Sequence, residues 1–322
     1  MERMGLSLSR GTMARLVIRV AKALRPVMEC LDRDIRGSPV LGMDETGVQV
    51  LKEPGRSPEQ QSYMWVARGF YIPDKPEAKS MPLIRFAYHD SRSGNVAEAM
   101  VGTGFSGYLQ TDGYGGYSKI GRRPGIDHVG CWAHIRREFH RLYVSNTKST
   151  LAAQVLNLIR RLYTIERKHR QALDDKTITQ EEFLEQRKTA TQPVFEEILT
   201  WLHDHQNAVL PQGNLGKAIS YALGQYRRAI RYVDHWLLTP DNNAVERAIR
   251  PFVIGRKNWQ FIDTQAGAMA SACLYSLIET AKANGHEPYR YLCFLFATLP
   301  PVASDAAAVS RLLPYRLDPK AY

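Results

Sequence analysis

The sequence lacks a long apolar run and has few cysteines. No uninterrupted apolar stretch approaches the roughly 20 residues that a membrane-spanning helix needs, so we expect no membrane partner. The N-terminus contains basic residues but no continuous apolar stretch and no cleavage site, which argues against a signal peptide. The four cysteines are Cys30, Cys131, Cys273 and Cys293. Their scattered spacing is typical of a protein in a reducing cytoplasm and not of a disulfide framework.

Acidic residues are also scarce relative to basic ones. The 322 residues include 43 Lys and Arg but only 32 Asp and Glu, which gives a net charge of +11 and a pI near 9.5. An excess of this size favours a polyanionic partner, nucleic acid before membrane. The apolar content of 44% and charged content of 23% are ordinary for a globular protein. One large or two smaller domains fit this length.

The order of periodic segments predicts an α/β fold. Helical spacing of apolar residues covers residues 9–36, with Ser9 as a fair N-cap. Strand patterns cover residues 40–43, 46–51, 63–70, 83–88, 108–111 and 126–132, and residues 94–101 form a short helix. Long amphipathic helices then replace strand signals between residues 147 and 235, as in residues 151–169 and 181–205. A short helix with Glu246, a strand at residues 259–262 and two closing helices from residue 268 follow.

Three acids lie in similar positions relative to these elements. Asp44 and Asp112 each follow a short apolar run, and Glu246 lies in the first turn of its helix among arginines. Carboxylates at strand ends can converge at one sheet edge, where hard oxygen ligands suit Mg²⁺. Two such ions serve phosphoryl transfer, which depends mainly on positioning and charge neutralisation.

Each acid also has a simpler interpretation. Asp112-Gly113 is a common turn pair, and residues 44–47 (DETG) can form a hairpin connection. Residues 243–246 (NAVE) resemble a capping box, in which Glu246 returns to the amide of Asn243.

Other polar residues surround these acids in the sequence. Cys131 and His134 have the spacing of half a metal site, but no second pair completes a zinc site, so packing beside the acids is the favoured interpretation. The residues that we expect to contact DNA are Arg136, Arg137, Arg247, Arg250, Arg256 and Lys257, with Trp259 as a candidate to stack on a base. The basic run at residues 160–170 is interpreted as surface.

Six segments, in order, resemble the DDE transposases of the bacterial insertion-sequence sixty-six family. They are residues 44–46 (DET), 107–114 (GYLQTDGY), 131–137 (CWAHIRR), 241–247 (DNNAVER), 255–259 (GRKNW) and 275–282 (YSLIETAK). The resemblance implies an RNase H-like mixed sheet with flanking helices and a helical insertion before the third acid. It also implies that Asp44, Asp112 and Glu246 bind two Mg²⁺ or Mn²⁺ ions.

By this resemblance, the protein cleaves DNA at the ends of a mobile element and transfers the freed 3′-hydroxyl into target DNA. It is then expected in the cytoplasm, associated with the nucleoid, as a homo-oligomer on DNA. The predicted segments are 1–36 (tail of a DNA-binding region), 37–146 (catalytic core), 147–240 (helical insertion), 241–300 (second part of the core) and 301–322 (tail).

Two other functions compete with this hypothesis. Members of the family usually carry a longer N-terminal region for recognising element ends, and Gly47 stands where a proline often follows the DET motif. A truncated, non-catalytic DNA-binding remnant that regulates an intact transposase is therefore one alternative. A metal-dependent nuclease without a transfer step is the other.

Overall fold

The chain forms two compact units, seen in a computed structural model that describes residues 8–74, 79–145 and 150–320. The first unit contains Met1–Gly107, Arg123–Gly125 and Ala244–Tyr322, and the second contains Tyr108–Arg122 and Ile126–Asn243. The predicted segment ends at residues 1, 146, 147 and 322 lie outside the described residues.

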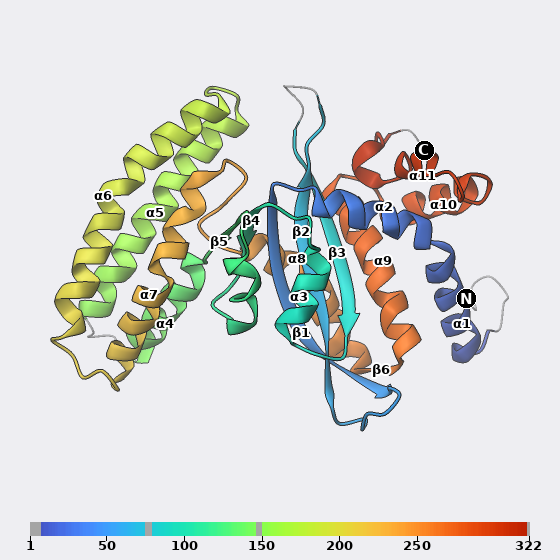
Figure 1. The fold of residues 1–322 in the computed structure, drawn as a ribbon, viewed down its shortest axis with the longest axis horizontal. Helices are drawn as coiled ribbons and strands as arrows, with labels where there is room; N and C mark the ends of the chain where they lie inside the picture. Colours follow the sequence, from blue (N-terminus) through green and yellow to red (C-terminus); the bar gives the residue numbers. More distant parts are fainter. Residues whose placement is uncertain (1–7, 75–78, 146–149, 321–322) are drawn as a thin grey trace. The chain divides into compact units, whose positions relative to one another are not determined.

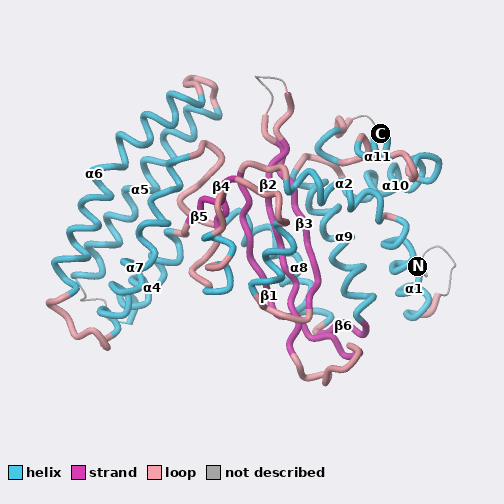
Figure 2. Tube along the Cα trace, in the orientation of Figure 1, coloured by secondary structure: helices cyan, strands magenta, loops and turns pink. Residues whose placement is uncertain are grey.

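Six strands form a mixed sheet (Figures 1 and 2). Their bounds are β1 (Val40–Lys52), β2 (Gln61–Tyr71), β3 (Met81–His89), β4 (Gly107–Gln110), β5 (Ile126–Val129) and β6 (Phe261–Thr264). The order is β3-β2-β1-β4-β5, and β6 pairs in parallel with the end of β1. The predicted α/β class is therefore confirmed, and the sheet with its helices is compatible with an RNase H-like fold.

Strand β1 is a single element where the sequence predicts two. It pairs antiparallel with β2 in unbroken register from Gly42 opposite Arg68 to Gln49 opposite Gln61. Asp44 therefore lies within a strand, opposite Val66, and the hairpin interpretation of residues 44–47 is wrong. The polar run is typical of a turn, but pairing with a long neighbouring strand outweighs local preference.

Helix α9 (Gln265–Ala283) closes the free edge of β3. The Thr280 hydroxyl bonds both the N–H and the carbonyl of Ile84, and the Ser276 hydroxyl accepts the N–H of Phe86 at 2.8 Å. The Asn284 amide donates to the carbonyl of Pro82. These side chains stand four residues apart, so one helix face satisfies the backbone groups that an edge strand leaves unpaired.

Helix α8 (Asn243–Trp259) packs on one face of the sheet. Its apolar side chains Val245, Ala248, Ile249 and Phe252 join a buried cluster with alternate residues of β1, β2 and β3. The helix has 17 residues and includes Gly255 to Trp259, so the predicted short helix is wrong in length. The predicted strand begins two residues later than expected, at Phe261.

The remaining helices of the first unit are α1 (Arg10–Ala23), α2 (Arg25–Arg36), α3 (Gly94–Val101), α10 (Pro288–Thr298) and α11 (Ala306–Ser310). The single helix predicted over residues 9–36 is divided at Leu24, with Pro26 in the first turn of α2. Proline lacks the N–H that a continuous helix would require there. The cap is as predicted, because the Ser9 hydroxyl accepts the N–H of Thr12.

The second unit is built on long helices, α4 (Trp132–Ser145), α5 (Thr150–Asp174), α6 (Gln180–Gln206) and α7 (Asn214–Ala229) (Figure 1). Trp132 stacks on Phe195 in its core. Buried Glu166 pairs with Arg170 and with fully buried Arg187. The prediction that the whole basic run at residues 160–170 is surface is therefore wrong for Arg170.

Candidate active site

Asp44 lies on the sheet face that α8 covers. Side chains alternate along a strand whose register is unbroken, so Asp44 shares its face with Val48 and Val50 of the α8 cluster. Its carboxylate accepts the N–H of Glu45 at 2.8 Å. Glu45 is on the opposite face, where its almost fully buried carboxylate pairs with Arg92 at 2.7 Å. Asp44 is thus the acid of the DET motif that α8 faces.

Glu246 lies in the first turn of α8 and is half-buried. Its neighbours Val245 and Ala248 enter the cluster against the sheet. The helix begins at Asn243, whose N–H donates to the Asp241 carboxylate. Asn243 is therefore inside the helix and not its N-cap, which is the position that the capping-box interpretation requires.

Two arginines of α8 act on residues of the strands beside Asp44. Arg256 donates to the Thr46 hydroxyl at 3.0 Å, two residues along β1 from Asp44. Arg247 lies close enough to Arg68 of β2 to lower the pKa of that guanidinium. Arg250 and Lys257 are exposed on the same helix.

Arg68 is a candidate that the sequence interpretation missed. It is on the same face as Met64 and Val66, and it stacks over the Phe70 ring with 4.6 Å to the centroid. Burial, and then the Arg247 charge, lower its pKa to about 10. Within the described parts of the chain, no carboxylate lies within 4.0 Å of its guanidinium. An arginine inside an otherwise apolar strand was the available signal.

Trp259 is packed into the protein on one side. Its ring meets Phe252 edge-on at 5.5 Å between centroids. A side chain at Gly255 would come within 2.9 Å of the Tyr275 hydroxyl and 3.1 Å of the Trp259 indole nitrogen. The glycine of the GRKNW segment therefore permits these aromatic residues to approach α8.

Asp112 belongs to the second unit, in the turn after β4. Its Oδ1 accepts the N–H of Tyr114 at 2.9 Å, which is the turn geometry expected for an Asp-Gly pair. Burial raises the pKa of nearby Tyr221 to about 12, with a further contribution from the Asp112 charge. The turn role and a ligand role are compatible, because Oδ2 is not used by this bond.

Cys131 and His134 open α4 in the same unit. The Cys131 sulfur accepts the N–H of Asn242 at 3.3 Å, and burial raises the pKa of the thiol to about 12. Burial therefore favours the neutral thiol over the thiolate. His134 donates its backbone N–H to the Cys131 carbonyl. Arg136 and Arg137 are exposed one turn further along.

No group of three or more His, Cys, Asp or Glu side chains that could hold a metal ion occurs in the described ranges. Asp44 and Glu246 are in the first unit with Arg68, Arg247 and Arg256, and Asp112 is in the second with Cys131, His134 and Arg136. No helix among the described residues is long and apolar enough to cross a membrane.

Comparison with known families agrees with the resemblance of the motifs. A model of the transposase IS66 family matches residues 1–270. The chain belongs to the IS66 transposase family. A second model, the IS66 C-terminal element, matches residues 276–315 and so covers the Ser276 and Thr280 side chains that close the edge of β3.

Curated relatives of this IS66 chain come from Sinorhizobium fredii. The uncharacterized protein y4jD is 30% identical over 319 residues, which are 97% of this chain and 60% of that protein. The uncharacterized protein y4qI is 28% identical over 327 residues, which are 98% of this chain and 58% of that protein. The chain spans about three-fifths of the length of these relatives.

Proposed function

We propose that this IS66-family chain cleaves DNA at the ends of a mobile element and joins the freed 3′-hydroxyl to target DNA. The observation that carries the proposal is the position of Asp44 on the sheet face covered by α8, the helix that contains Glu246. Arg68, Arg247 and Arg256 bring positive charge to the same elements. Acids for a metal and cations for phosphates are the two requirements of phosphoryl transfer.

The donor set fits a hard divalent cation. Asp44, Asp112 and Glu246 would offer carboxylate oxygens, which Mg²⁺ and Mn²⁺ prefer. Two bound ions would activate the attacking oxygen and stabilise the leaving one. Asp44 and Glu246 belong to one unit and Asp112 to the other.

The basic residues would hold the substrate. The Arg256 guanidinium is oriented by the Thr46 hydroxyl, so its remaining N–H groups can bind a phosphate near Asp44. The Arg247 charge disfavours the charged form of Arg68, and a phosphodiester bound between the two would relieve this repulsion. Arg250 and Lys257 would contact the DNA backbone further along α8.

The test is a comparison of neighbouring acids. We expect Asp44→Asn, Asp112→Asn and Glu246→Gln to reduce strand cleavage and strand transfer at least 100-fold (about 3 kcal/mol of barrier). DNA affinity measured in EDTA should change little, because the arginines remain. Glu45→Gln is the matched control, because Glu45 is next to Asp44 but pairs with Arg92 on the opposite face.

The substrates are a labelled duplex with an element end and the same end already cut, each with Mg²⁺ or Mn²⁺. Unchanged cleavage in both Asp variants would refute the metal-holding role. DNA binding without any cleavage of either substrate would favour the regulatory remnant. Nicks without joined products would favour a nuclease. Light scattering with and without DNA tests the expected homo-oligomer.

A further inference from the structure

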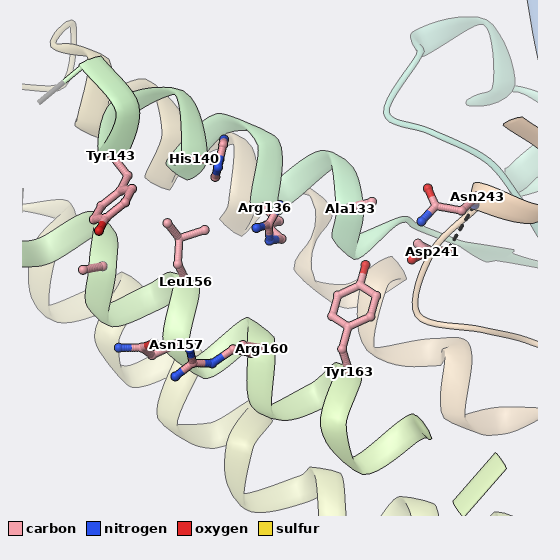
Figure 3. Close-up of a pocket in the computed structure, with 11 residues that line it drawn as sticks. Ala133, Arg136, His140, Tyr143, Leu156, Asn157, Arg160, Tyr163, Asp241 and Asn243 are labelled. Atoms are coloured by element: carbon pink, nitrogen blue, oxygen red, sulfur yellow. Dashed lines mark hydrogen bonds between the residues drawn. The ribbon is translucent and has the colours of Figure 1, made fainter. Parts of the chain in front are cut away.

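A cavity of about 620 Å³ lies between α4 and α5 in the second unit (Figure 3). Helix α4 contributes Arg136, His140 and Tyr143, and α5 contributes Leu156 and Arg160. Its volume is in the range of sites that hold one small ligand. Apart from Arg136, none of these residues belongs to the proposed catalytic or DNA-contacting set.

Two guanidinium groups dominate the cavity. Arg136 of α4 and Arg160 of the facing helix α5 both line the cavity (Figure 3). In the described part of the chain, neither forms an ion pair with a carboxylate. Arg161, the next residue of α5, instead pairs with Glu197 on the surface. Two unneutralised guanidiniums that face one cavity are well suited to bind a phosphate.

The acidic end of the cavity is already bonded. Asp241 accepts the N–H of Asn243 at 3.1 Å, and half-buried Tyr163 lines the same end of the cavity. Burial, and then the Asp241 charge, raise the pKa of Tyr163, so its hydroxyl stays protonated. We therefore expect an anion to bind away from Asp241, between the two arginines.

The other end of the cavity offers a surface for a flat ring. Tyr143 is 40% exposed, and Figure 3 shows it near Leu156 of the facing helix. The Asn157 amide and the His140 ring add hydrogen-bonding groups beside them. An aromatic ring with amide and imidazole groups next to a phosphate site matches the parts of a nucleotide.

We propose that the cavity between α4 and α5 binds one unpaired nucleotide of a DNA strand. Its phosphodiester would lie between Arg136 and Arg160, and its base would lie against Tyr143. In a duplex each base is paired and stacked in the helix, so only an unpaired base can lie against Tyr143, and the site selects single-stranded over duplex DNA. The inference rests on the proposed function only in taking DNA as the partner, because no metal or catalytic acid is needed.

The experiment measures the affinity of the full chain for a fluorescent single-stranded oligonucleotide in EDTA, as a function of salt. We expect Arg136→Gln with Arg160→Gln to weaken binding at least tenfold and to reduce the slope of log affinity against log salt by about 0.7, since the two arginines share one phosphate and each lost phosphate contact is worth about 0.7 for a single strand. Tyr143→Ala should weaken binding about tenfold, and Tyr143→Phe should not.

Arg161→Gln is the control, with the same charge change at the neighbouring position. Equal weakening by Arg160→Gln and Arg161→Gln would overturn the proposal, as would unchanged affinity in the Arg136/Arg160 double variant. Displacement of the oligonucleotide by equimolar dAMP would show a free-nucleotide site instead. Equal losses for duplex and single strand would show a general backbone contact.

Cleavage of the duplex substrate separates the two proposals. If the proposed function fails and this inference holds, Asp44→Asn leaves cleavage unchanged while the cavity variants still lose single-strand affinity. If only this inference fails, the acids remain essential and the cavity variants bind normally. Circular dichroism of each variant tests that it is folded, which we expect because Arg136 and Arg160 are exposed.

Discussion

Replacing Arg68 by methionine should make the free protein more stable and weaken its binding to DNA. The guanidinium lies half-buried on β2, has Arg247 as its charged neighbour, and stacks on Phe70. A buried charge without an opposite partner is costly. Methionine has a similar length and removes that cost.

The magnitude follows from the pKa. Burial and the Arg247 charge lower the pKa of Arg68 from 12.5 to about 10. At about 1.4 kcal/mol for each pKa unit, the charge costs about 3.5 kcal/mol. Stacking on Phe70 returns about 0.5–1 kcal/mol, so the net gain from Arg68→Met should be about 2.5–3 kcal/mol.

The sign of the pH dependence is also determined. Arg68 is a cation whose pKa is lower in the folded chain than in the unfolded chain. Its cost is therefore fully present below pH 10 and disappears only as the pH rises towards 12.5. Measurements at neutral pH include the whole effect.

Urea unfolding without DNA, followed by DNA titration, tests the prediction. Arg85→Met on the adjacent strand is the matched control, because Arg85 pairs with Asp32 and its loss should destabilise the fold. We expect opposite signs for the two variants, and a tenfold or greater loss of DNA affinity for Arg68→Met only. A similar destabilisation by both substitutions would refute the argument that Arg68 lacks a compensating partner.

Two further predictions concern the scaffold. Thr280→Val should lower the free energy of unfolding by about 1–3 kcal/mol, because it leaves the N–H and carbonyl of Ile84 without their partner. Thr298→Val removes a bond only to a carbonyl of its own helix, so it should lower the free energy of unfolding by less in the same urea titration. Equal losses in the two variants would contradict the edge-closing role of Thr280. Burial, with nearby arginines, lowers the pKa of His128 to about 4. The folded chain therefore loses stability as the pH falls from about 6.5 to 4, where the unfolded chain binds the proton more readily. His128→Gln should remove up to about 3 kcal/mol of this loss, and identical acid unfolding profiles of the two proteins would exclude the effect.

Much of the architecture could be predicted because its signals are local. The helical period of α5 and α6 and the aromatic, β-branched runs of β2 and β3 depend on residues close in sequence. The order of the motifs also indicated the family that the comparison then showed. Local signals failed where long-range pairing decides, as in the polar residues 44–47 that continue β1 because β2 lies beside them.

The residue types of the candidate site followed from the sequence, but their neighbours did not. Strand alternation implies that Asp44 and Glu45 point to opposite faces, whereas only packing shows that α8 covers the face of Asp44. Arg68 is one arginine among many in the sequence, and it is distinguished by burial without a carboxylate partner.

By itself, the sequence determined the excess of basic residues and the type of most elements, and it singled out the three acids, since these depend on composition and short-range periodicity. The tertiary structure decided which groups share an environment. It determined that α9 hydroxyls close the edge of β3, that Arg256 bonds Thr46, and that Arg136 and Arg160 face one cavity. Such contacts join residues that are distant in sequence, and they exist only once the chain has packed.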